Sequence, residues 1–183
     1  NGAFAFPGAL ASGGAYTVMV GTRPNYQSCT ISNGTGSIAG ANVTNVSVTC
    51  AANGPQHAYV ANSGDNTVSI YSIDATTGAL TAVGTPVATG GAPSWITINP
   101  AGTYAYVANN TGNTVSVYSI DATTGGLTQV GSPVATGTGP YSVTVNPAGT
   151  YAYVANFISN NVSAYSINAA TGALTMVGSP VAA

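Results

Sequence analysis

The chain has 183 residues, of which only 2% are charged, and its formal net charge is −2. Nucleic-acid binding and docking on anionic membrane surfaces both need clusters of Lys and Arg. The chain has one such residue, Arg23, so neither function is expected. No stretch reaches the roughly 18 unbroken apolar residues of a membrane-spanning helix, so membrane insertion is not expected. Abundant Val, Ile, Tyr and Thr predict a folded, all-β chain.

Residues 1–52 form the first predicted domain, a small β-sandwich-like module. Apolar and polar residues alternate there as in β-strands, and the apolar positions are Phe4, Phe6, Tyr16, Val18 and Val20. A turn is predicted at Gly21–Tyr26 and a further strand at Asn42–Cys50. No signal peptide precedes this module, so we expect a processed chain or a fragment.

Both cysteines of the chain, Cys29 and Cys50, lie in this first domain. The alternatives are two unrelated buried thiols and a disulfide, and the strand-rich, uncharged composition favours the disulfide. Its Cα atoms are expected about 5–6 Å apart. A disulfide predicts an oxidising location: extracellular, cell-surface or periplasmic.

Residues 53–183 form the second predicted domain and contain three copies of one repeat. The tetrapeptide Tyr-Val-Ala-Asn starts at Tyr59, Tyr106 and Tyr153, always 47 residues apart. Turn residues divide each copy into four short segments of strand character. In the second copy these segments are Ser94–Asn99, Tyr104–Asn109, Thr114–Ile120 and Leu127–Ala135. Four antiparallel strands repeated every forty-odd residues predict β-propeller blades.

The first repeat raises the question of where its innermost strand comes from. In the repeat register, residues 48–51 stand where Trp95–Ile98 stand in the second copy. Either the last strand of the first domain completes the first blade, which we favour, or this blade has only three strands of its own.

The repeat resembles a known family. Tyr-Val-Ala-Asn, Asn-Thr-Val-Ser-Val-Tyr-Ser-Ile-Asp and Thr-Gly-Gly-Leu-Thr are similar to the YVTN-type repeat of seven-bladed, lactonase-like propellers, over about residues 55–183. This resemblance implies hydrolysis of a sugar lactone on the central face of the propeller, where such enzymes use acidic and basic residues. Residues 53–183 contain no Lys, Arg or Glu, so the chain departs from the family at that point.

The first domain also resembles a known module. The segments Asn1–Phe6 and Val46–Cys50 are similar to a small β-sandwich module that precedes such repeats in bacterial surface proteins and lipoproteins. That module normally has further strands upstream.

The carboxylates of the repeats are predicted to be turn residues. Asp74 and Asp121 are equivalent in the first two copies, and Asn168 takes their place in the third. Asp and Asn both accept a backbone N–H bond in a turn, whereas only Asp can transfer a proton. A turn-forming role therefore fits all three residues, and a catalytic role does not.

Two further polar residues, Asp65 and His57, have ordinary structural interpretations. Asp65 aligns with a glycine and a serine, which favours a turn over a calcium loop, because calcium sites use several oxygen ligands. His57 aligns with tyrosines in the other two copies, which favours a half-buried strand position over a catalytic or ligand-binding histidine. The sequence predicts no metal and no other cofactor.

Trp95 and Tyr141 stand one position apart in the innermost strands of the second and third copies. Such aromatic residues can stack on carbohydrate, but packing between blades is the more frequent role.

Three functions remain open. Propellers close with four to eight blades, so three blades leave open edges, and an uncharged surface offers little repulsion between copies. We expect a non-enzymatic extracellular structural protein that self-associates into homo-oligomers or fibres. The alternatives are a carbohydrate-binding or adhesion module and a fragment of a lactonase-like enzyme.

Overall fold

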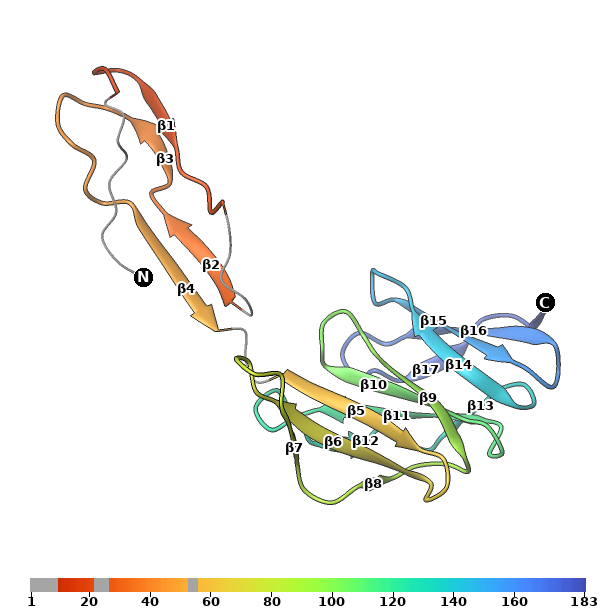
Figure 1. The fold of residues 1–183 in the computed structure, drawn as a ribbon. Coiled ribbons are helices and arrows are strands. Elements are labelled where there is room, and N and C mark those ends of the chain that lie inside the picture. The colour runs from red at the N-terminus through yellow and green to blue at the C-terminus, as the bar shows by residue number, and fades with distance from the viewer. Residues whose placement is uncertain (1–9, 22–26, 53–55) are drawn as a thin grey trace. The chain divides into compact units, whose positions relative to one another are not determined.

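The computed structural model describes residues 10–21, 27–52 and 56–183, and every regular element within them is a β-strand. No helix among these residues has the length and apolar character needed to cross a membrane. Phe4, Phe6, Arg23 and most of the expected turn at 21–26 lie outside the described residues. The chain divides into two compact units, residues 1–54 and 55–183 (Figure 1).

The first unit contains two small antiparallel sheets. Strand β1 (Ala15–Thr17) pairs with β3 (Thr35–Ser37), and β2 (Gln27–Ser32) pairs with β4 (Ser47–Ala52). The strand expected at 42–50 is thus shorter at its start, because its partner β2 ends at Ser32, which pairs with Ser47. Val18 and Val20 likewise lie beyond the end of β1.

The second unit consists of three antiparallel sheets, one per repeat, and is a partial β-propeller (Figure 1). The first blade contains β5 (Gln56–Asn62), β6 (Thr67–Ile73), β7 (Leu80–Ala82) and β8 (Val87–Ala88). The second contains β9 (Pro93–Ile98), β10 (Tyr104–Asn109), β11 (Thr114–Ile120), β12 (Leu127–Gln129) and β13 (Val134–Ala135). The third contains β14 (Pro140–Val145), β15 (Tyr151–Asn156), β16 (Asn161–Ile167), β17 (Leu174–Met176) and β18 (Val181–Ala182).

The fourth strand of each blade is interrupted, where the sequence predicted one continuous strand over 127–135. In the second blade β12 pairs with one end of β11, at Tyr118–Ile120, and β13 pairs with the other, at Thr114–Val115. Between them Gly131 has a φ of 62° and Pro133 has no N–H to donate, so the chain bends away before it pairs again.

Among the residues that the structure describes, the first blade has no innermost strand, and the expectation that residues 48–51 supply it is wrong. Strand β4, which contains them, pairs with β2 in a separate sheet. The sheet of the first blade contains β5, β6, β7 and β8, so β5 is its edge strand.

The blades bury their apolar side chains against one another in two clusters. One joins blades one and two and contains Val68, Ile70, Ala105, Val107, Tyr118 and Leu127. The other joins blades two and three and contains Tyr106, Ala108, Val115, Val117, Val143, Ala152, Val154, Tyr165 and Leu174. Each blade therefore has a forward face, toward the next blade in sequence, and a backward face, toward the previous one.

A buried asparagine at the end of the second and third Tyr-Val-Ala-Asn segments ties neighbouring blades together. The Asn109 side-chain nitrogen donates to Thr114 Oγ1 at 3.1 Å and to Ser116 Oγ at 2.9 Å. Its oxygen accepts from Thr89 Oγ1, of the preceding blade, at 3.0 Å. Asn156 makes the equivalent bonds in blade three, and no buried side-chain polar atom of the described residues is left unpaired. These hydrogen bonds link Asn109 and Asn156 to the preceding blade and so help to fix the packing of one blade on the next.

Candidate functional site

The innermost strands β9 and β14 present the two aromatic residues singled out from the sequence. Trp95 lies in β9 and Tyr141 lies at a register shift in β14, and their side chains are 48% and 62% exposed. In the repeat register Tyr141 corresponds to Ser94, whose hydroxyl donates to Pro140 O at 2.9 Å. Tyr141 therefore replaces a small hydrogen-bonding residue with an exposed ring.

A third exposed aromatic residue lies beside Tyr141, and sequence reasoning missed it. The ring of Phe157 lies 6.3 Å from that of Tyr141, centroid to centroid, with the planes inclined by 48°. Phe157 follows β15 in a turn where the first two copies have Ser63 and Asn110. An aromatic residue in a turn that is polar in the other copies is the signal that could have found it. Together, Tyr141 and Phe157 form an exposed ring pair in blade three.

The repeated acidic position forms the turn between the third and fourth strands. Asp121 Oδ1 accepts from Thr123 N at 3.0 Å and from Thr124 N at 2.7 Å, and Asp74 makes the matching bonds in blade one. The Thr124 backbone and hydroxyl bonds, together with the Thr123 bond, lower the pKa of the Asp121 carboxyl. Asn168 accepts equivalent bonds in blade three without any charge.

His57 lies in a groove between the first two blades. Its ring packs on Gly125 so closely that a Cβ at that glycine would lie 2.3 Å from it. Together with Tyr59, Ile120, Asp121 and neighbouring residues it lines a groove of about 240 Å³. In the next junction Tyr104 takes the place of His57, packs on Gly172 and donates its hydroxyl to Ala170 O. His57 therefore packs between blades at the position that Tyr104 occupies in the next junction, with a smaller aromatic ring.

These residues do not form a catalytic or metal-binding cluster. No group of three or more His, Cys, Asp or Glu comes together within residues 10–21, 27–52 and 56–183. The Asp74 and Asp121 carboxylates are engaged in their turns, and Asp65 lies in a turn closed by its own N–H to Asn62 O at 3.3 Å. What the arrangement offers a ligand is aromatic surface, hydroxyls and backbone groups.

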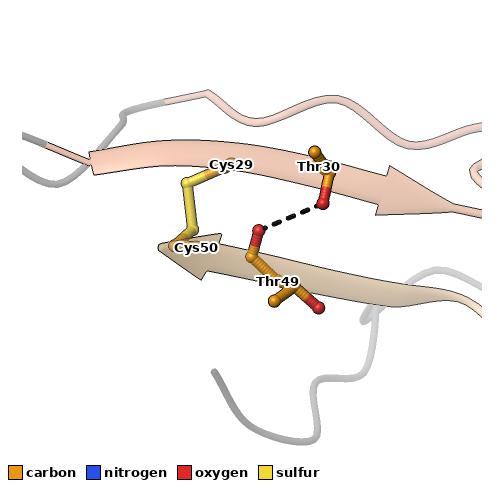
Figure 2. Close-up of a disulfide and its surroundings, with 4 residues drawn as sticks. All are labelled: Cys29, Thr30, Thr49 and Cys50. Carbon is orange, nitrogen blue, oxygen red and sulfur yellow. Dashed lines mark hydrogen bonds between the residues drawn. A yellow bond between two sulfur atoms is a disulfide. The ribbon is translucent and has the colours of Figure 1, made fainter. Parts of the chain in front are cut away.

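The disulfide joins the two longer strands of the first unit (Figure 2). Cys29 in β2 and Cys50 in β4 are direct partners in the antiparallel register, so their Cα atoms lie 4.0 Å apart, closer than the separation expected from the sequence. Beside it Thr30 Oγ1 donates to Thr49 O at 3.4 Å. The bond fixes one end of a sheet for which the described part of the chain supplies two strands.

Removing the disulfide is expected to destabilise the first unit alone. A two-stranded sheet is marginal in water, and closing a loop of this length stabilises by about 3 kcal/mol in the chain-entropy model. The double variant Cys29→Ser, Cys50→Ser should therefore lose amide-exchange protection across β2 and β4 while β10 and β15 keep theirs. Equal loss of protection in both units would contradict this expectation.

Comparisons with known proteins agree with the blade architecture. A family model described as "Lactonase, 7-bladed beta-propeller" matches residues 30–143 and 93–183. The chain therefore belongs to this propeller family. A search of curated proteins found no match.

Among similar solved structures is a candidate 6-phosphogluconolactonase from Bacteroides fragilis NCTC 9343, with 28% identity, a TM-score of 0.63, and coverage of 69% of this chain and 36% of that one. A protein from Lactobacillus plantarum has 26% identity and a TM-score of 0.64 over 69% of this chain and 39% of that one. The periplasmic gluconolactonase PpgL of Pseudomonas aeruginosa, at 18% identity and a TM-score of 0.62 over 69% and 37% of the two chains, shares the fold alone. The chain thus spans less than two-fifths of the length of each of these proteins.

Proposed function

We propose that these three blades are a sugar-facing, non-catalytic sector of a lactonase-type propeller that further blades complete. The observation that carries the proposal is the exposed aromatic surface on blades two and three, Trp95, Tyr141 and Phe157, in a chain of this family. Exposed aromatic rings are the surface on which the apolar faces of sugars stack, and a propeller holds its ligands near its innermost strands.

The chemistry of the described blades favours binding over hydrolysis. Opening a lactone needs an acid and a base whose pKa values suit the working pH. Hydrogen bonds within their turns lower the pKa values of Asp74 and Asp121, which makes both carboxylates weaker bases. If the complete ring hydrolyses a lactone, the proton-transfer groups come from blades other than these three.

The expected ligand is a neutral sugar or its lactone. A phosphorylated sugar is normally held by Arg or Lys, and residues 53–183 contain neither. Hydroxyl-rich surfaces and aromatic rings suit an uncharged ligand.

We place the protein outside the cytoplasm, in the periplasm, on the cell surface or in the surrounding medium. The Cys29–Cys50 bond supports an oxidising compartment. The resemblance of the first unit to a module of bacterial surface proteins and lipoproteins supports the same location.

The only tryptophan of the chain allows a direct test of ligand binding. Adding glucono-δ-lactone or glucose to the full chain should change Trp95 fluorescence in a saturable way. Tyr141→Ala, which removes one of the exposed rings, should weaken this response at least fivefold, because one stacking surface is lost.

Met176→Ala is the matched control, since Met176 is also exposed but lies in β17, at the opposite edge of the same sheet. A fluorescence response that Tyr141→Ala leaves unchanged would contradict the binding site. Lactone hydrolysis by the chain above the rate in buffer would contradict its non-catalytic role.

A structural role through self-association is the second candidate. The observation that favours it is that both outer blade faces carry exposed apolar side chains, Val60 and Leu80 on blade one and Tyr153 on blade three.

A further inference from the structure

The groove at the junction between blades one and two differs in chemistry from the matching place in the next junction. Its lining includes both ionisable and apolar side chains, namely His57 and Tyr59 of blade one and Ile98, Ile120 and Asp121 of blade two. In the repeat register the next junction has Tyr104 in place of His57 and Asn168 in place of Asp121. This groove therefore has a His and an Asp where the next junction has a Tyr and an Asn.

The smaller ring of His57 keeps the groove open. In the next junction the Tyr104 hydroxyl extends far enough to donate to Ala170 O, a reach that an imidazole ring does not have. The groove beside His57 has a volume of about 240 Å³. This is below the range typical of sites for drug-sized molecules, so the groove suits a small ligand.

His57 and Tyr59 form an aromatic corner in this groove. Their ring centroids lie 6.5 Å apart, and the planes are inclined by 44°. The Tyr59 hydroxyl donates to Gly125 O at 2.8 Å, and the His57 ring packs on the same glycine, so both rings are held in place without a ligand. Aromatic rings arranged around a small volume attract ammonium groups through cation–π contacts.

Asp121 adds a negative charge at the exposed side of the groove. Its Oδ1 accepts the three bonds from Thr123 and Thr124 that form the turn, which leaves Oδ2 available to a ligand. Those bonds, and to a lesser extent the nearby His57, lower the pKa of the carboxyl, so it is ionised at neutral pH. Residues 53–183 contain no Lys or Arg to pair with it.

We propose that this groove binds a small organic cation of the quaternary ammonium class, with its nitrogen beside the rings of His57 and Tyr59 and near the Asp121 carboxylate. Ile98 and Ile120 supply apolar surface for the methyl groups of such a cation. A metal ion fits less well, because a single carboxylate offers too few oxygen ligands.

The single histidine of the chain allows a direct test, because its NMR signals come from this groove. Tetramethylammonium chloride, added to the full chain at pH 8, where histidine side chains are normally neutral, should shift the His57 ring signals in a saturable way. We expect a dissociation constant of roughly 1–10 mM, because the carboxylate is open to solvent. Neither tert-butanol, which has nearly the same shape without the charge, nor sodium chloride should give this response at the same concentrations.

The other copies of the repeat indicate substitutions that preserve the fold. Asp121→Asn keeps the turn, since Asn168 accepts the equivalent bonds in blade three, and should weaken tetramethylammonium binding about fivefold. Asp74→Asn is the matched control, because it removes the same charge from the same turn of blade one, and Asp74 does not line the groove. This control should leave binding unchanged. His57→Tyr should fill the groove and abolish saturation transfer to the methyl protons of tetramethylammonium.

The cation site would be overturned by ring signals that do not respond to tetramethylammonium, or that respond equally to tert-butanol or glucose. It would also be overturned if Asp121→Asn had no effect, if Asp74→Asn had an equal effect, or if binding survived His57→Tyr. This site goes beyond the proposed function. Trp95, which reads out sugar binding, does not line the groove, so the two proposals can fail separately.

Discussion

Tyr106→Ala is expected to lower the free energy of unfolding of the propeller unit by about 4 kcal/mol, the cost of deleting a large buried aromatic side chain. Tyr106 is fully buried in the cluster between blades two and three, where Ala108, Val154 and Leu174 are its neighbours in the core. Burial, and to a lesser extent Tyr104, raise the pKa of the Tyr106 hydroxyl to about 12. The variant loses packing and also leaves the Gly172 carbonyl without its hydroxyl donor.

Tyr153→Ala is the matched control, because it makes the same change at the same repeat position on the open face. It should cost roughly 1 kcal/mol or less at protein concentrations low enough to keep the chain monomeric, since that side chain is already partly solvated. Urea unfolding followed by Trp95 fluorescence measures both variants. Equal losses of stability would show that the burial of Tyr106 between blades two and three does not account for its contribution to the free energy of unfolding.

Much of the propeller unit could be predicted from the sequence because the repeat supplies three copies of the same local pattern. The second-blade strands expected at 104–109 and 114–120 are the observed β10 and β11. The turns at Asp74, Asp121 and Asn168 depend on contacts within three residues. Local chemistry of this kind is visible in a sequence.

The sequence did not predict which distant, unrepeated segments pair as β-strands. Nothing in residues 42–52 shows that β4 pairs with β2, since any extended strand of six residues can offer its backbone to several partners. The candidate site was found only in part for a similar reason: Phe157 contacts Tyr141 across 16 positions, and only the structure brings the two rings together. The sequence also showed that an asparagine ends each Tyr-Val-Ala-Asn segment, without showing that Asn109 and Asn156 are buried.

The second large expected effect on stability comes from a substitution of the buried Asn109. Asn109→Asp is expected to lower the free energy of unfolding by about 4 kcal/mol at pH 7, because it replaces a buried amide with a carboxylic acid that must ionise or stay protonated at a cost. The side chain is fully enclosed, and a Cβ at Gly90 would lie 2.5 Å from it, so no space remains for hydrating water. Residues 53–183 contain no Lys or Arg to pair with the new charge.

The pH dependence gives this variant a clear sign. Burial raises the pKa of the new carboxyl in the folded state above its unfolded value of about 4, so the folded variant holds its proton more tightly than the unfolded one. Its stability relative to wild type is therefore greatest below about pH 4 and falls as the pH rises through the folded-state pKa. The wild-type baseline is favourable for this measurement, because the whole chain has three acidic residues and one histidine.

Asn62→Asp makes the same change in blade one, where the side chain bonds to Thr67 and Ser69 but is only partly buried. Water can reach a carboxylate there, so its loss of stability should be smaller and depend less on pH. Urea unfolding of both variants between pH 3 and pH 8 separates burial of charge from loss of the amide donor. If Asn109→Asp lost the same stability at every pH, the amide hydrogen bonds rather than the enclosed position would account for the role of this asparagine.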